Sequence, residues 1–150
     1  MLSVLSPVSG HSLQLRYLPD PVFSGGLVGP GLAIRPRAGR RPAVAPVSGR
    51  LVKLHPHAYL ILSDEGEGIL VHLGLDTVRM KGDGFTVLAH ELDAVDAGTE
   101  IVIWDPAYVE STGRSAACAV VVLDCDPSIV KSHAVDTDVE AGDLLFQVDC

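Results

Sequence analysis

The sequence has few aromatic residues and no long hydrophobic run, and each shortage excludes a class of protein. Its longest unbroken apolar stretch is Ala116–Leu123, far short of the ~20 residues that a membrane-spanning helix needs. The first residues carry no basic segment ahead of an apolar one, so we expect no signal peptide and no insertion into a membrane. Aromatic residues make up only 5% of the chain, so we expect a core of Val, Leu, Ile and Ala.

Cysteine is also scarce, with three residues at positions 118, 125 and 150. The number is odd and the spacing contains no C-x-x-C pair. Cys118 lies inside the apolar run and is typical of a buried packing residue. We therefore expect a reducing, cytoplasmic setting.

Basic residues are outnumbered, with 11 Lys and Arg against 19 Asp and Glu and a net charge of -8. This balance argues against general binding to nucleic acid or to anionic membranes. The charge is uneven, because residues 1–53 carry seven basic residues and one acid. Much of the positive charge lies in Arg35–Arg41, which is typical of a solvated hairpin loop.

The length of 150 residues, with 47% hydrophobic and 20% charged residues, predicts one folded domain over residues 1–150. Two motifs recur along the chain. Ser6–Gly10 returns almost unchanged as Ala45–Gly49, and Val95–Gly98 returns as Val139–Gly142. Such repeats are typical of related β-hairpin units in which glycine occupies turn positions.

Alternating or continuous apolar segments between turn residues predict most of the secondary structure as strands. Fifteen glycines and ten prolines separate these segments. The pattern indicates an all-β protein, an antiparallel β-sandwich or flattened barrel with a few short helices. Helix-start signals, an Asp followed by Pro, occur at Asp105 and Asp126, and Gly84–Glu91 is expected to form one or two helical turns. The expected strands are Gly31–Ile34, Arg50–Leu54, Tyr59–Leu62, Gly68–Leu75, Thr99–Trp104, Ala117–Leu123 and Asp143–Val148.

One of the six histidines lies on a strand whose two faces differ in character. Alternation along Gly68–Asp76 gives one face that is wholly apolar and predicts that His72, Gly74 and Asp76 share the other. That face offers an imidazole, a position without a side chain, and a carboxylate. We expect Gly74 to leave room for a partner to approach the His72 ring.

A second histidine comes near His72 if the two neighbouring strands form a hairpin. A turn over Asp64–Gly68 would bring His57 and His72 almost into register, with their rings side by side. From the residues alone, two chemistries remain open. His55, His57, His72 and Asp76 could ligate zinc for hydrolysis. Alternatively, one histidine could accept a phosphoryl group while its neighbour stabilises the charge.

The segment Val71–Phe85 resembles the signature V/I-H-F/L-G-I/L-D-T-V-x-L-x-G-E/D-G-F of the glucose-type IIA component of the bacterial sugar phosphotransferase system. Three further segments resemble motifs of that family in the same order. Pro19–Gly31 is similar to P-D-x-V-F-x-x-x-x-x-G-x-G, Ala45–Gly49 to A-P-V-x-G, and His57–Tyr59 to H-A-F. The resemblance covers nearly the whole chain.

This resemblance implies a β-sandwich phosphocarrier without a cofactor. His72 would accept a phosphoryl group on Nε2 from the phosphohistidine of the carrier HPr. It would pass the group to a cysteine of a IIB domain that serves a sugar permease. His57 would hydrogen-bond the phosphoryl group without being phosphorylated.

The resemblance also implies a docking surface for these partners. Asp20 and Asp76 match two acids that flank the family's site and meet basic side chains of partners, while Phe23 and Phe85 match apolar residues around a shallow depression. Regulated metabolic enzymes or transporters are further expected partners. The sugar is not specified, since glucose, N-acetylglucosamine and β-glucoside systems share this component.

The chain departs from the family pattern at three places. The segment before His57 is shorter by about two residues, and it places His55 where a Thr is common. Because the family motifs begin at Ser6, we expect the chain to lack the N-terminal tail that binds membranes in many members. The Arg35–Arg41 loop is unusually basic. Zinc peptidases with H-x-x-x-D and H-x-H motifs resemble this fold type but carry the motifs in the opposite order, which disfavours the zinc reading. A purely regulatory binding domain is the other alternative.

Overall fold

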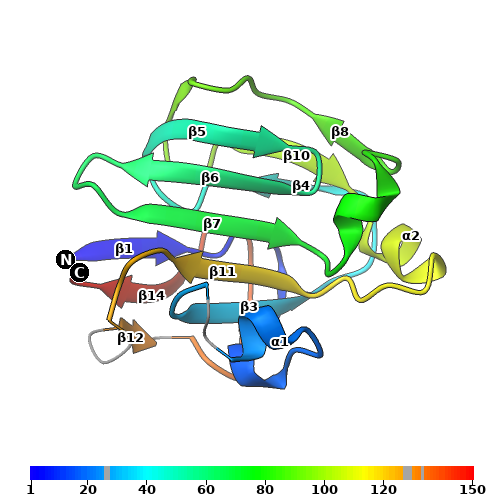
Figure 1. Ribbon diagram of the computed structural model, residues 1–150, viewed down its shortest axis with the longest axis horizontal. Helices are drawn as coiled ribbons and strands as arrows, with labels where there is room; N and C mark the ends of the chain where they lie inside the picture. The colour runs from blue at the N-terminus through cyan, green and yellow to red at the C-terminus, as the bar shows by residue number, and fades with distance from the viewer. Residues whose placement is uncertain (26–27, 127–129, 133) are drawn as a thin grey trace.

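The described residues form three antiparallel sheets (Figure 1). The computed structural model describes residues 1–25, 28–126, 130–132 and 134–150. The largest sheet has eight strands, in the order β13 (Asp138–Val139), β2 (Gly10–Gln14), β3 (Gly31–Pro36), β11 (Cys118–Val122), β7 (Gly68–Leu73), β6 (Ala58–Ser63), β5 (Gly49–His55) and β9 (Ala94–Val95). The smaller sheets are β1 (Leu2–Leu5), β14 (Leu144–Val148), β12 (Val130–Ser132) and β4 (Arg41–Val44), β10 (Glu100–Trp104), β8 (Phe85–Val87).

The main core lies between the inner face of the large sheet and the two smaller sheets. Alternate residues of β7, namely Ile69, Val71 and Leu73, are fully buried. They join one apolar cluster with Trp104 of β10 and Phe146 of β14. Because aliphatic side chains dominate this cluster, the core has the composition expected from the sequence. The antiparallel, packed-sheet architecture with a few short helices is confirmed.

Short helices cover part of the outer face of the large sheet. The 3-10 helix η1 (Leu15–Tyr17) and the helix α1 (Pro21–Ser24) lie in front of β3 (Figure 1). Their apolar side chains form a second cluster with residues of β3 and β11. Two further short helices are the 3-10 helix η2 (Thr77–Met80) and α2 (Pro106–Ser111), which begins after Asp105 as the sequence predicts.

The repeated motifs occupy equivalent positions in two hairpin units. The Leu5 N–H donates to the carbonyl of Pro46, and the Val44 N–H donates to that of Pro7. The serine of each repeat also accepts a hydrogen bond from the second pair of motifs. The Ala141 N–H donates to the Ser9 hydroxyl, and the Ala97 N–H donates to the Ser48 hydroxyl. The internal repetition in the sequence therefore corresponds to two similar units that are hydrogen-bonded to each other.

All seven strands expected from the sequence are present, although their ends differ by one or two residues. The helical turns expected over Gly84–Glu91 are wrong, because Phe85–Val87 pairs with β10 as strand β8. The helix start expected at Asp126 falls largely on residues 127–129, outside the described residues. In the part of the chain that the structure describes, no helix has the length and apolarity to cross a membrane.

The cysteines include a pair that the sequence did not indicate. Cys125 and Cys150 form a disulfide with a Cα–Cα distance of 5.3 Å, while Cys118 is free and buried in β11. The odd number of cysteines concealed this pair. Cys118 is a packing residue and has no partner among the described cysteines. Cys125 and Cys150 come together because β12, which follows Cys125, pairs with β14, which precedes Cys150.

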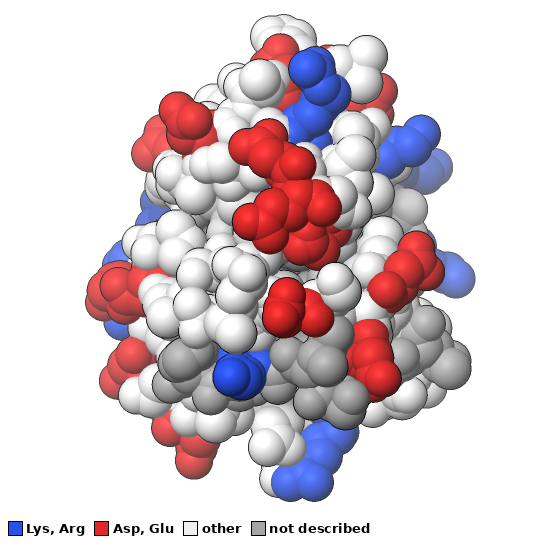
Figure 2. Space-filling view, turned by 90° about the vertical axis from the view of Figure 1, so that its left-hand side faces the viewer, with Lys and Arg blue, Asp and Glu red and all other residues white. Residues whose placement is uncertain are grey.

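Acidic side chains gather on the end of the molecule that carries both chain termini (Figure 2). The β6–β7 turn contributes Asp64, Glu65 and Glu67 to this end. The opposite end carries the tip of the β5–β6 hairpin and the C-terminal end of β7 (Figure 1). The second end of the large sheet holds His55, His57 and His72.

Candidate functional site

The sheet register places two histidines and two alanines in one row across four strands. His55 of β5 pairs with Ala58 of β6, Ala58 pairs with His72 of β7, and His72 pairs with Ala119 of β11. Directly paired residues of antiparallel strands point to the same face of a sheet. This face lies opposite the main core, and small alanine side chains lie on both sides of His72 in the row.

His57 enters the site from the hairpin turn that joins β5 to β6. The turn consists of Pro56 and His57, and the Leu73 N–H donates to the His57 carbonyl at 2.7 Å. The His57 ring lies edge-on to His72 with centroids 5.3 Å apart, and it stacks on His55 at 5.6 Å. The prediction that the rings lie side by side is correct, although the residue in register with His72 is Ala58.

One hydrogen bond fixes which nitrogen of His72 can react. Its Nδ1 lies 2.5 Å from the carbonyl oxygen of Gly74. A carbonyl can only accept, so Nδ1 must carry the proton that is donated. In the neutral ring, Nε2 then holds the free lone pair and is the nucleophilic atom.

Burial keeps both imidazoles neutral. Desolvation lowers the pKa of His72, although the bond to Gly74 and the charge of Asp20 act in the opposite direction. Desolvation, together with repulsion from His72 and His55, lowers the pKa of His57 to about 4. At neutral pH the site therefore presents two uncharged rings, one of which has an available lone pair.

Gly74 has a different role from the one expected. Its φ of 78° lies in the left-handed region, and a Cβ there would lie 2.6 Å from Thr77 Cγ2 and 3.0 Å from the Ser115 carbonyl oxygen. The position is filled by neighbouring chain and leaves no room for a partner. Its contribution is the carbonyl that orients His72, which the sequence did not indicate.

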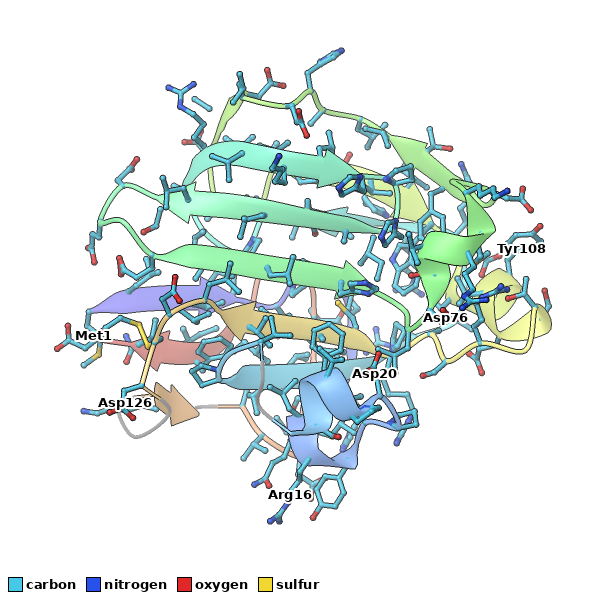
Figure 3. All side chains as sticks on the ribbon, viewed as in Figure 1. Met1, Arg16, Asp20, Asp76, Tyr108 and Asp126 are labelled. Carbon is cyan, nitrogen blue, oxygen red and sulfur yellow. A yellow bond between two sulfur atoms is a disulfide. The ribbon has the colours of Figure 1, made fainter. Side chains whose placement is uncertain are left out.

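Asp76 does not share the strand face of His72 as predicted. Strand β7 ends at Leu73, and Asp76 itself has a φ of 60°, so the alternation stops before it. Its carboxylate lies 3.1 Å from Nε of Arg79 and 3.9 Å from Nε of Arg114. Figure 3 shows Asp76 at the same end of the molecule as Asp20. The pairing with Arg114 had no signal in the sequence.

The other predicted docking residues fall into two groups. Asp20 caps α1 by accepting from the Val22 N–H at 2.9 Å, and its charge acts on His72. The buried Phe23 lies edge-on to the His72 ring at 5.4 Å. Phe85 instead stacks on Trp104 at 6.1 Å and, among ring contacts of the described residues, is paired with neither histidine.

The zinc alternative finds no matching ligand set. In the described part of the chain, no group of three or more His, Cys, Asp or Glu side chains is arranged to hold a metal ion. Asp76, its expected carboxylate ligand, is engaged by two arginines. The geometry is that of a nucleophilic imidazole with a second imidazole beside it.

The comparisons with known proteins agree with this geometry. A family model described as phosphoenolpyruvate-dependent sugar phosphotransferase system, EIIA 1, matches residues 2–127. The chain belongs to this EIIA family. The resemblance seen in the sequence motifs is thereby confirmed.

Individual relatives extend the match over nearly the whole chain. A glucose-specific EIIA component of Halalkalibacterium halodurans is 37% identical over 93% of this chain and 81% of its own length. A glucose-specific EIIBCA component of Corynebacterium glutamicum is 35% identical over 92% of this chain, which corresponds to 21% of that longer protein. The solved glucose permease IIA from Mycoplasma capricolum superposes with a TM-score of 0.88 at 32% identity, covering 97% of this chain and 94% of its own.

Membership of the EIIA family defines the class of function. EIIA components are phosphocarriers of the sugar phosphotransferase system that pass a phosphoryl group to a IIB domain, and this chain is a phosphocarrier of that kind. The similarity to the EIIBCA component supports a IIB domain as its partner. No support is found for a zinc hydrolase.

Proposed function

We propose that His72 is the residue that carries the phosphoryl group and that phosphorylated HPr is its donor. The observation that supports this assignment is the hydrogen bond from Nδ1 to the Gly74 carbonyl, which leaves Nε2 free. The lone pair on Nε2 attacks the phosphorus of the donor phosphohistidine, and the donor imidazole leaves with the bonding electron pair. His72 keeps its Nδ1 proton throughout, so it needs no separate base.

His57 stabilises the transferred group in this scheme. A phosphoryl group on His72 carries roughly two negative charges. It places them close to the His57 ring, which lies 5.3 Å from the His72 ring. These charges raise the pKa of His57 and favour a ring that donates a hydrogen bond to a phosphoryl oxygen. The group then moves to a thiolate of the IIB domain, where the P–N bond breaks and a P–S bond forms.

Partners would approach through the rim around His72. Phe23 supplies an apolar contact against the ring, and Asp20 places a negative charge close to it. Asp76 and Phe85 remain predicted docking residues at the edge of this surface. We place the relay in the cytoplasm, and it requires no cofactor.

The test is phosphoryl transfer with purified components. Incubation with phosphoenolpyruvate, enzyme I and HPr is expected to add one acid-labile phosphate to the wild type and none to His72→Gln. We expect His57→Gln to accept the phosphate but to pass it to a IIB cysteine far more slowly. His90→Gln, which changes an exposed histidine outside the site, is the matched control.

Three results would contradict the assignment. Acid-labile phosphate on His72→Gln would exclude His72 as the acceptor. If the wild type gained no phosphate while a control IIA did, the chain would act as a regulatory binding domain of this family. An unphosphorylated His57→Gln would show that the two histidine roles are reversed.

A further inference from the structure

A third histidine, which the proposed relay does not use, completes a row of rings at the site. His55 stacks on His57 with an interplanar angle of 26°, and His57 in turn lies edge-on to His72 at 67°. His55 is exposed, whereas the other two rings are partly buried. The middle ring is therefore held between one ring on the solvent side and one ring that would carry the phosphoryl group.

Hydrogen bonds hold the backbone around this hairpin tip, and the His57 ring makes aromatic contacts on two sides. The Glu91 carboxylate accepts from the Leu54 N–H at 3.2 Å. Gly82 lies next to the Pro56 ring, because a Cβ added at Gly82 would be 3.4 Å from Pro56 Cγ. His57 itself belongs to a turn, and its described ring contacts are the two other imidazoles. Without His55, the described aromatic contact that remains to His57 is its edge-on contact with His72.

We propose that His55 is a positioning residue for phosphoryl transfer, whose ring stacks on His57 and holds it edge-on to His72. This inference rests on the proposed phosphocarrier role of His72. The stack acts before the reaction, because a hydrogen-bond donor stabilises the transferred group only if it already faces it. His55 touches neither the phosphoryl group nor the reacting nitrogen, and it acts through His57.

The charges around His57 are set by few groups. His55 faces it from β5 and His72 from β7, and both repel a proton on His57. Asp20 of the α1 cap acts on His72. The Glu91 carboxylate accepts a hydrogen bond from the backbone of β5. Lys81 and Asp83 flank Gly82, which lies next to Pro56. Replacing His55 removes a ring and a repelling group while leaving the others in place.

Two variants separate the ring from its charge. His55→Phe keeps a flat aromatic face, whereas His55→Ala removes it. A stacked aromatic pair is worth enough to change a rate by roughly three- to tenfold. We expect His55→Ala to slow transfer from His72 to the IIB cysteine by that factor and His55→Phe to restore it to within about twofold. His90→Ala is the control for removing an exposed imidazole.

A double variant tests whether His55 acts through His57. If it does, His55→Ala/His57→Gln transfers no more slowly than His57→Gln alone, because the positioned ring is already lost. Multiplication of the two defects would overturn the inference. Transfer by His55→Ala at the wild-type rate would also overturn the inference.

Proton NMR of the unphosphorylated protein gives a readout that does not depend on the relay. The His57 ring protons should show a ring-current shift from residue 55 in the wild type and in His55→Phe, and the shift should decrease in His55→Ala to the part that His72 causes. The pKa of His57 should rise from about 4 in His55→Ala as repulsion and desolvation decrease. Unchanged His57 signals would overturn the stacking. A wild type that takes up no phosphate would refute the proposed function, whereas normal uptake with normal transfer by His55→Ala would refute only this inference.

Discussion

At the scale of single residues, the site depends on two imidazoles that the fold keeps neutral. His57 has a pKa of about 4 and His72 has a lowered pKa, both chiefly because of desolvation. In the unfolded chain a histidine titrates near 6.5. The folded state therefore binds fewer protons than the unfolded state between these values, and both residues make unfolding easier as the pH falls.

This linkage predicts how stability changes with acid. The contribution of His57 is fully present above about pH 6.5 and is lost progressively as the pH falls toward 4. One group changes the free energy of unfolding by at most ~1.4 kcal/mol per pH unit, and solvent reduces this because His57 is partly exposed. Urea unfolding at pH 7 and pH 4.5 should show a smaller acid loss for His57→Gln than for the wild type. Equal losses in the two proteins would show that the pKa of His57 is not lowered in the folded state.

At the scale of elements, the sequence predicted the long apolar strands and missed the short ones. Strands such as Gly68–Leu73 alternate or run apolar between turn residues, so their pattern is readable. The short strand Phe85–Val87 carries no such pattern and exists because β10 supplies backbone partners. The site followed the same division. His57 and His72 could be paired from a hairpin within one stretch of chain, whereas Arg114 meets Asp76 only through the tertiary fold.

The Cys125–Cys150 disulfide is an element-scale crosslink that ties the end of β14 to the segment after β11. It closes a loop with a sequence separation of 25, for which chain entropy gives about 3.5 kcal/mol of stabilisation. We expect Cys125→Ser to lower the free energy of unfolding by about that amount, with little effect on phosphorylation because the histidines lie at the other end of the sheet. Urea unfolding of the wild type with and without a dithiol reductant measures the same quantity. A midpoint that reductant leaves unchanged would mean that the two thiols are not bonded in solution.

At the scale of the whole molecule, acidic side chains lie at both ends of the large sheet. Acidic side chains gather at the end with the β6–β7 turn (Figure 2), and Asp20 lies at the histidine end (Figure 3). The negative charge of Asp20, which acts on His72, would attract a basic partner and increase the rate of encounter more than the final affinity. Because such steering acts over about a Debye length, only charges near the docking surface should affect it strongly.

This argument predicts a position-dependent effect of salt on phosphorylation by HPr. The second-order rate should fall several-fold between about 0.05 and 0.5 M NaCl, as expected for screened association. Asp20→Asn should weaken that dependence, whereas Glu65→Gln, which removes the same charge from the exposed turn at the far end, should leave it almost unchanged. Stopped-flow measurement of phosphate transfer across a salt series gives both slopes. Equal slopes for the two variants would assign the effect to net charge alone, and Asp20 would then act only as the cap of α1.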